Sequence, residues 1–203
     1  MGSLLRFPLS PEFVSRFPIF IETGYGDGRS LRYAAEHNFQ TLTSIELWPD
    51  CVRNGRRDFA DDLRVNVIYG HSAAQLVSLL CDKDAPIFFW LDAHFPGTDY
   101  NHQPTDSEPD EYIRLPLRYE LSVIREMLPG SNYFVAIDDL RFYADLAWGD
   151  GLIPAMFHST LPKARDLDFL NPFRATHRVE IDLHDSGYAL IGPHDAPFLA
   201  FKE

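Results

Sequence analysis

Acidic side chains follow two apolar segments of the chain, at 86–91 and 133–137. Asp92 comes directly after the first segment, with His94 two places on, and Asp138 and Asp139 follow the second. If the two segments are neighbouring strands of a parallel sheet, their carboxyl ends meet at the edge where such sheets bind ligands. Carboxylates gathered there repel one another, and a hard divalent cation such as Mg²⁺ relieves that repulsion.

These residues predict a metal site formed by Asp92, Asp138 and Asp139, and a catalytic pair formed by Asp92 and His94. A bound cation would lower the pKa of a substrate hydroxyl group, and His94 could accept its proton as a general base. Two plainer interpretations remain. Asp138 or Asp139 caps the next segment while only Asp92 faces a ligand, or His94, beside Phe95, is an ordinary loop side chain.

A glycine-rich turn follows another apolar segment near the start of the chain. The run at 19–21 leads into Glu22, and the next residues of the turn include Gly24, Tyr25, Gly26 and Gly28. A strand, a glycine-rich turn and a helix together open the nucleotide-binding half of a doubly wound sheet. The spacing G-x-G-x-G is one residue shorter than the dinucleotide fingerprint G-x-G-x-x-G. An ordinary tight turn is the alternative interpretation.

Further candidate ligand residues follow the next two predicted strands. Glu46 closes the strand at 41–46 and precedes Leu47, and His71 and Ser72 come soon after the strand at 65–69. In a doubly wound sheet, an acid about 20 residues after the glycine-rich turn accepts hydrogen bonds from both ribose hydroxyl groups. Alternatively, Glu46 is a solvated turn residue, and His71 is a loop histidine beside a helix cap.

Strands and helices are predicted to alternate along most of the chain. Apolar or β-branched runs predict strands at 18–23, 41–46, 65–69, 86–91 and 133–137. Helices are predicted at 12–17, 29–36, 50–61, 72–80 and 117–128. Two further strands, at 178–183 and 188–191, flank a turn and predict a hairpin. We therefore expect an α/β fold with a doubly wound, Rossmann-like and mostly parallel sheet that ends in an antiparallel hairpin.

Length and composition limit the classes of protein that fit. The chain has 203 residues, 45% of them hydrophobic, and a net charge of −12. We expect one domain over 1–203 with an N-terminal lead-in at 1–17, and neither nucleic acid nor an anionic membrane as partner. Cys51 and Cys81 are predicted to be buried free thiols. The first residues resemble neither a signal peptide nor a membrane span, so a soluble, cytoplasmic protein is expected.

The segment at 95–115 is rich in Pro, Gly and acidic residues and shows no periodicity. It predicts a lid-like insertion over the acidic edge of the sheet, with a solvated excursion as the alternative. The aromatic residues in and after this segment are Tyr100, Tyr112, Phe142, Tyr143 and Trp148. They could line a substrate pocket, although aromatic clusters more often belong to the hydrophobic core. The aromatic lead-in and the segment at 140–170 could also pack against a second copy, so a homodimer is possible.

The glycine-rich turn preceded by an acid resembles the first motif of class I S-adenosylmethionine-dependent methyltransferases. That resemblance implies that the turn cradles the methionine part of the cofactor and that Glu46 binds its ribose. Members of the family commonly carry an Asp near the adenine amino group where this chain has His71. The resemblance makes the following residues candidates for cofactor binding: Glu22, Gly24, Tyr25, Gly26, Gly28, Glu46, Leu47, His71 and Ser72.

The acids after the fourth and fifth predicted strands are similar to those of metal-dependent small-molecule O-methyltransferases of the macrocin or catechol type. In this chain, His94 follows Asp92 by two residues, where the macrocin-type pattern has three. The resemblance implies divalent-metal-assisted methylation of an oxygen atom on a small molecule. Two other functions stay open, an NAD(P)-linked oxidoreductase and a non-catalytic nucleotide-binding module.

Overall fold

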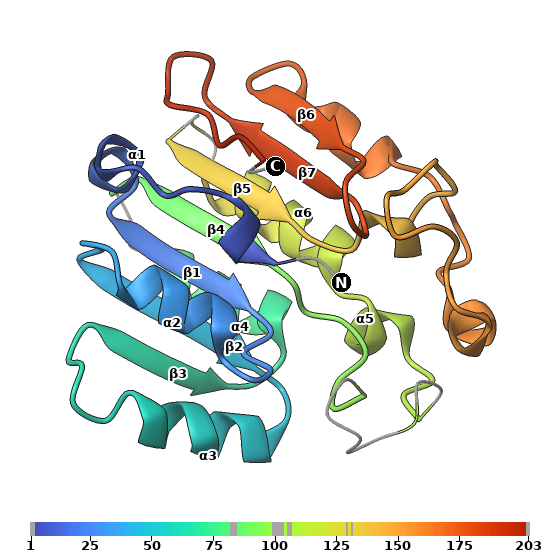
Figure 1. Ribbon diagram of the computed structural model, residues 1–203, viewed down its shortest axis with the longest axis horizontal. Helices are drawn as coiled ribbons and strands as arrows, with labels where there is room; N and C mark the ends of the chain where they lie inside the picture. Colours follow the sequence, from blue (N-terminus) through green and yellow to red (C-terminus); the bar gives the residue numbers. More distant parts are fainter. Residues whose placement is uncertain are drawn as a thin grey trace.

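The computed structural model describes residues 3–81, 85–98, 104, 107–128, 130 and 132–201. Its strands form one sheet in the order β3-β2-β1-β4-β5-β7-β6 (Figure 1). The strands are β1 Ile19–Thr23, β2 Thr41–Glu46, β3 Val65–Tyr69, β4 Ile87–Leu91, β5 Tyr133–Ile137, β6 Arg178–Asp182 and β7 Tyr188–Gly192. The first five are parallel, whereas β7 runs antiparallel to β5 and β6 antiparallel to β7. The predicted sheet and its terminal hairpin are confirmed.

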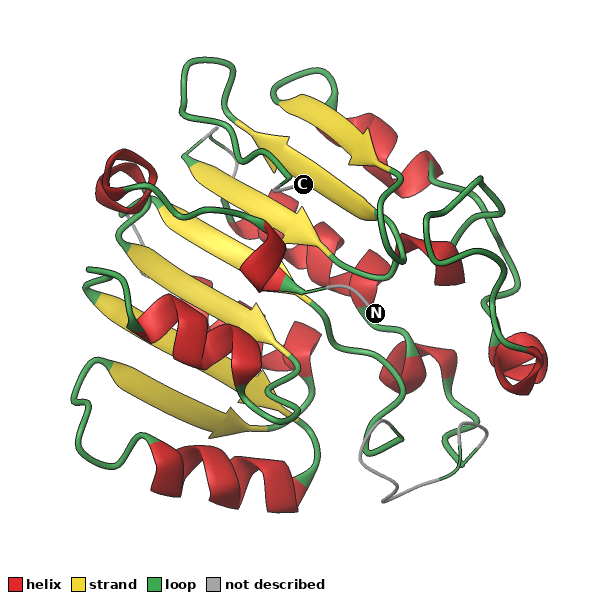
Figure 2. Cartoon of the chain, in the orientation of Figure 1, coloured by secondary structure: helices red, strands yellow, loops and turns green. Residues whose placement is uncertain are grey.

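Helices cover both faces of this sheet, as Figure 2 shows. The α-helices are α1 Pro11–Arg16, α2 Arg29–Ala35, α3 Pro49–Asp58, α4 Ser72–Leu80, α5 Glu111–Arg114 and α6 Leu117–Met127. Short 3-10 helices are η1 Leu4–Arg6, η2 Leu140–Phe142, η3 Ala155–Thr160 and η4 Asp168–Phe173. Among the described residues, the helices are all too short or too polar to cross a bilayer.

Alternation along each strand divides the core into two layers. On β4, Phe89 and Leu91 pack with α4 and α6, while Phe88 and Trp90 pack with α1, α2 and α3. Both faces of a doubly wound sheet are covered in this way, which is why β1, β4 and β5 are apolar almost throughout.

The aromatic residues of the lead-in, Phe7, Phe13 and Phe17, are buried against the chain's own sheet. One expectation about the cysteines differs from the structure. Cys51 is buried in α3 as expected, but Cys81 is exposed. It lies one helical turn after the exposed Val77, on the solvent-facing side at the end of α4, so its prediction as a buried thiol was wrong.

The strand order places a ligand site between β1 and β4. Strands β2 and β3 extend from one side of β1, while β4 and β5 extend from the other. Open α/β sheets bind ligands at the carboxyl ends of the strands where the order reverses in this way. The glycine-rich turn leaves β1 at this point, and Asp92 follows β4 directly beside it.

Candidate active site

A cleft with about 1070 Å³ of free space, its open mouth included, lies at this switch point. The structure brings most of the predicted site residues to its walls. Those that line it are Gly24, Tyr25, Gly26, Glu46, Leu47, His71, Ser72, Asp92, His94, Asp138 and Asp139. Glu22 and Gly28 belong to the same turn but are not part of the wall. A cleft of this size can hold a nucleoside-containing ligand.

Gly24 brings the glycine-rich turn against the end of β4. Its φ of +83° is the left-handed conformation that glycine adopts without strain. A Cβ atom at this position would lie 2.8 Å from the backbone oxygen of Asp92. At Gly28, also left-handed, a Cβ atom would collide with the ring of Tyr25. The glycines therefore allow two close contacts, one between strands and one within the turn.

Glu46 links the end of β2 to the glycine-rich turn. Its Oε2 accepts a hydrogen bond from the backbone N–H of Gly26 at 3.0 Å, and its Oε1 accepts one from Trp48 N–H at 2.6 Å. The side chain is 7% exposed and faces the cleft. Each carboxylate oxygen keeps a second lone pair, so the group can still accept hydrogen bonds from a diol.

Glu22 lies below the cleft rather than in its wall. It is fully buried, and its Oε1 accepts a hydrogen bond from Ser44 Oγ at 2.7 Å, which joins the ends of β1 and β2. Burial raises its pKa well above the ordinary value, against the smaller lowering by the Ser44 hydroxyl. Glu22 therefore fixes the two strands that carry Gly24 and Glu46, and its Oε2 is buried without a hydrogen-bond partner among the described residues.

His71 joins the cleft wall to α5. Its Nε2 lies 2.9 Å from the backbone oxygen of Tyr112, and the two rings stack at 4.0 Å between centroids. Because a carbonyl oxygen only accepts, Nε2 carries the hydrogen in this contact. In the neutral ring Nδ1 is then an acceptor, and it is buried with no hydrogen-bond partner among the residues described. An acceptor at this place suits an amino group of a ligand.

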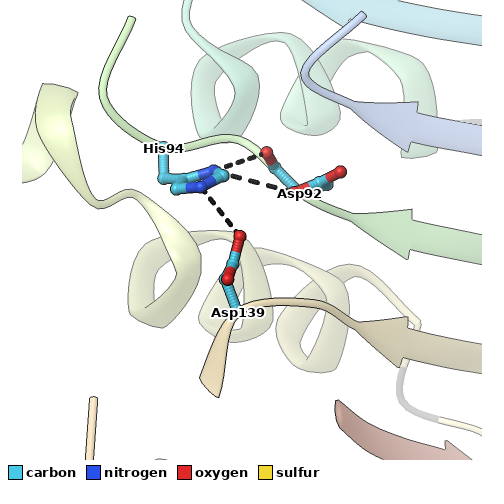
Figure 3. Close-up of side chains that lie close together, drawn as sticks. All are labelled: Asp92, His94 and Asp139. Carbon is cyan, nitrogen blue, oxygen red and sulfur yellow. Dashed lines mark hydrogen bonds and ion pairs between the residues drawn. The ribbon is translucent and has the colours of Figure 1, made fainter. Parts of the chain in front are cut away.

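Asp92, His94 and Asp139 converge at the ends of β4 and β5 (Figure 3). One ligand atom from each lies within 4.8 Å of the others. His94 Nδ1 is 2.9 Å from the backbone oxygen of Asp92, and its Nε2 is 3.0 Å from Asp139 Oδ2. The carbonyl fixes the hydrogen on Nδ1, so the lone pair of Nε2 in the neutral ring points toward the Asp139 carboxylate. Either a proton or a cation has to mediate that contact.

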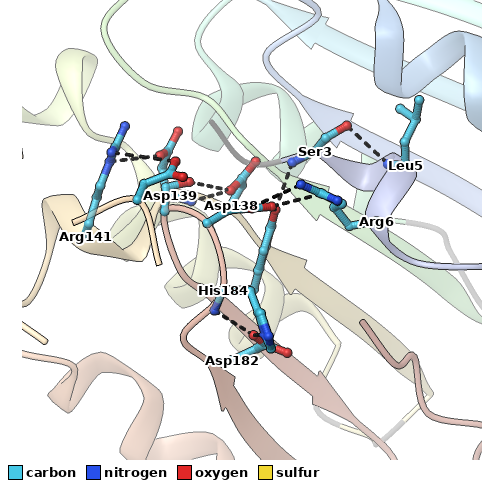
Figure 4. Close-up of polar contacts among 12 residues, drawn as sticks. Ser3, Leu5, Arg6, Asp138, Asp139, Arg141, Asp182 and His184 are labelled. Carbon is cyan, nitrogen blue, oxygen red and sulfur yellow. Dashed lines mark hydrogen bonds and ion pairs between the residues drawn. The ribbon is translucent and has the colours of Figure 1, made fainter. Parts of the chain in front are cut away.

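Asp138 is directed differently from its neighbour. Its Oδ1 accepts a hydrogen bond from Asp139 N–H at 2.7 Å, and Figure 4 shows the two neighbouring acids. The same oxygen accepts one from Ser186 Oγ at 3.3 Å, which the predicted three-acid metal site did not anticipate. Asp139 takes a left-handed φ of 54° and faces His94 instead. Among the residues that the structure describes, the group with metal-ligand spacing is therefore Asp92, His94 and Asp139, with His94 in the place expected for Asp138.

The pKa values of the two adjacent acids, Asp138 and Asp139, are shifted in opposite directions. Burial, followed by repulsion from Asp139 and Asp92, raises the pKa of Asp138 well above its ordinary value. Burial also raises the pKa of Asp139, but hydrogen bonding and attraction from His94 outweigh it, so the net pKa lies below the usual range. Asp138 is thus the member of the pair that holds its proton more strongly, and Asp139 is the member that ionises more readily.

The donor set fits a divalent cation. It offers two carboxylates and an imidazole whose other nitrogen is fixed by a backbone carbonyl, the arrangement typical of a metal-bound histidine. The remaining oxygen of Asp139, Oδ1, is buried without a hydrogen bond among the described residues, and Arg141 Nε lies 3.5 Å from it. This oxygen forms an ion pair with Arg141 but no short hydrogen bond, so the Asp139 carboxylate keeps a lone pair that a cation beside Asp92 and His94 could use.

The described residues of the predicted lid contact the rest of the chain. Phe95 N–H donates to the backbone oxygen of Arg114 at 2.8 Å, which closes the segment at its base. Arg114 is buried and donates to the backbone oxygens of Thr160 at 2.9 Å and Glu108 at 2.7 Å. Phe95 and Ile113 line the cleft.

The aromatic residues predicted to line a substrate pocket lie in different places in the structure. Phe142, Tyr143 and Trp148 are 2%, 3% and 6% exposed and belong to the core, and none of them lines the main cleft. The alternative interpretation of this cluster was therefore the correct one for these three residues. Tyr112 is the member that approaches the cleft, through His71. Tyr100 lies outside the described residues.

Sequence reasoning missed one acid beside the site. Glu120 on α6 is 1% exposed, and burial raises its pKa to about 7, although Ser72, Thr23 and His94 oppose the shift. The sequence did contain a signal for it. Glu120 stands three residues after Leu117 and four before Ile124, within the apolar face of an amphipathic helix.

Comparison with known proteins identifies the fold. No protein-family model and no curated sequence match the chain. Among solved structures, it is similar to an S-adenosylhomocysteine-bound methyltransferase from Podospora anserina, with 15% identity over 91% of this chain and 76% of that one and a TM-score of 0.59. A proposed caffeoyl-CoA O-methyltransferase from Staphylococcus aureus gives 13% identity, coverage of 86% and 75%, and a TM-score of 0.58.

A proposed rRNA methylase from Clostridium thermocellum matches over nearly the whole of both chains. It shows 12% identity, coverage of 95% of this chain and 98% of the other, and a TM-score of 0.60. Identities this low show a shared fold. The chain has the Rossmann-like fold of class I methyltransferases.

Proposed function

We propose that this protein is an S-adenosylmethionine-dependent O-methyltransferase that acts on a small molecule with the help of a divalent cation. The observation that carries the proposal is the contact between Gly24 and Asp92, which makes the glycine-rich turn and the acidic group two walls of one cleft. A methyl donor on the turn and an acceptor oxygen at the acids would then lie within reach of each other.

In the proposed reaction, the donor binds along the walls formed by β1, β2 and β3. The Gly24–Gly28 turn receives its methionine part, Glu46 accepts hydrogen bonds from its ribose hydroxyl groups, and Nδ1 of His71 accepts one from its adenine amino group. The methyl carbon leaves the sulfonium sulfur as its bond to the acceptor oxygen forms. The acceptor hydroxyl gives its proton to water in the open cleft, and S-adenosylhomocysteine is released. Most of the acceleration would come from positioning.

Asp92, Asp139 and Nε2 of His94 would hold the cation. When bound, it would lower the pKa of the acceptor hydroxyl and fix its oxygen. The Nε2 atom of His94 is directed at Asp139 Oδ2, 3.0 Å away, which favours this ligand role over the role of general base that the sequence alone predicted. The net charge of −12 favours a small molecule over RNA as the acceptor.

Calorimetric titration with S-adenosylhomocysteine and, separately, with NAD⁺ tests the choice of donor. Binding of S-adenosylhomocysteine without binding of NAD⁺ is expected, and binding of NAD⁺ alone would overturn the proposal. Transfer of radiolabelled methyl groups to catechol, simple phenols and sugars, with Mg²⁺ or with EDTA, tests the reaction. A protein that binds the donor but methylates none of them in either condition would fit the non-catalytic alternative.

A further inference from the structure

We propose that Glu120 is a fourth acid of the cation site, whose carboxylate stabilises a divalent cation held by Asp92, His94 and Asp139. Glu120 projects from α6, an element that contributes none of the other three residues. The inference rests on the cation site of the proposed function and adds to it a positioning residue that lies behind the three ligands.

The first observation is that Glu120 is buried with little to compensate its charge. Its side chain is 1% exposed, and no described group meets its carboxyl oxygens with good hydrogen-bond geometry. The hydroxyl groups of Thr23 and Ser72 adjoin the carboxyl group and lower its pKa, but the effect of burial is larger. A buried acid with so few partners is destabilising, and an apolar side chain in the same place would avoid that cost.

The second observation is a small cavity that connects Glu120 to the acidic group. It holds about 230 Å³ of free space, and its polar wall consists of Glu120, Asp92, His94, Asp138 and Asp139, with Tyr143 beside them. Asp92, His94 and Asp139 line the main cleft as well. The three candidate ligands therefore separate the substrate cleft on one side from Glu120 on the other.

The charges around this cavity explain why an acid there is useful. Asp139 is held by His94 and Arg141, two groups that oppose a cation when they are charged. A carboxylate at Glu120 adds negative charge on the far side of the ligands, at a depth where water screens little. Groups that support metal ligands from behind commonly change metal affinity by 10- to 100-fold when they are removed.

Electron paramagnetic resonance of free Mn²⁺ measures this contribution without reference to activity. Glu120→Gln removes the charge and keeps the shape, and Glu126→Gln, at an exposed position of the same helix, is the matched control. We expect Mn²⁺ affinity to fall about tenfold or more in Glu120→Gln and to be unchanged in Glu126→Gln. In EDTA, the melting temperature of Glu120→Gln should equal or exceed that of the wild type, because the amide removes the buried charge and keeps a hydrogen-bonding group beside Thr23 and Ser72.

A second variant keeps the test decisive if the amide disturbs folding. Glu120→Met preserves volume and removes polarity, so it should be at least as stable as the wild type and should bind Mn²⁺ as weakly as Glu120→Gln. Mn²⁺ affinity within twofold of the wild type in either folded variant overturns the inference alone. If the wild type binds no Mn²⁺ at millimolar concentration, both the inference and the proposed cation site fail.

Discussion

Gly24 lies so close to the end of β4 that a single added methyl group would come within 2.8 Å of the backbone oxygen of Asp92. The first residue of the glycine-rich turn and the first acid of the candidate cation site are thus packed backbone against backbone. This contact makes the turn and the acids one site rather than two, and it restricts position 24 to glycine.

Gly24→Ala should destabilise the fold and weaken binding of S-adenosylhomocysteine. The left-handed backbone alone costs an alanine about 1–2 kcal/mol, and the contact with Asp92 adds to that cost. Gly151→Ala is the matched control, because Gly151 has a φ of +76° and no atom near the added Cβ. Urea unfolding and calorimetry of both variants isolate the effect of the contact. Equal losses of stability would mean that the turn can move away from Asp92.

Asp139→Asn and Asp138→Asn should differ although the residues are adjacent. Asp139 ionises more readily than Asp138 and faces His94, so its amide variant should bind Mn²⁺ at least about tenfold more weakly. Asp138 has a raised pKa, and its Oδ1 accepts hydrogen bonds that an amide oxygen can also accept, so its variant should bind nearly as the wild type does. Titration with Mn²⁺ measures the affinity of both variants. A larger loss of affinity in Asp138→Asn than in Asp139→Asn would indicate that Asp138 is the ligand.

Glu46→Gln should weaken binding of S-adenosylhomocysteine by about 10- to 100-fold. Hydrogen bonds to a charged group are worth about 1.5–3 kcal/mol, and an amide can accept through one oxygen only. The N–H groups of Gly26 and Trp48 would compete for that oxygen. Calorimetry measures the affinity, with Glu126→Gln as an exposed control outside the cleft. Unchanged affinity in a folded Glu46→Gln protein would exclude the ribose role.

The stability advantage of Glu120→Gln over the wild type should grow with pH. The carboxyl group has an ordinary pKa of 4.5, and burial raises it to about 7 in the folded protein. Between these values the folded state keeps a proton that the unfolded state has lost, so this residue makes the free energy of unfolding fall as pH rises.

The amide variant lacks that contribution. The difference between the two proteins should therefore increase from about pH 4.5 to about 7 and then level off, by at most about 3 kcal/mol. Urea unfolding in EDTA at pH 5 and pH 8 measures it. A difference that does not change with pH would contradict the raised pKa of Glu120.

The sequence alone determined the sheet and the position of the cleft. Apolar runs that end in Glu22, Glu46 and Asp92 are local patterns, and parallel strands joined by helices can be arranged in few ways. The strand ends therefore had to meet, and the residues that follow them had to face one cleft. Gly24 could be identified from the sequence because the backbone of such a turn itself requires a glycine at this position.

Only the tertiary structure decided which side chains face each other. Asp138 and Asp139 are equivalent in the sequence, but the left-handed backbone at Asp139 directs one toward His94 and leaves the other with Ser186. Glu120 reaches the same place from a helix that precedes β5, through packing between distant segments. Such contacts depend on side-chain direction and burial, which periodicity does not encode, and they determine which acids can act together.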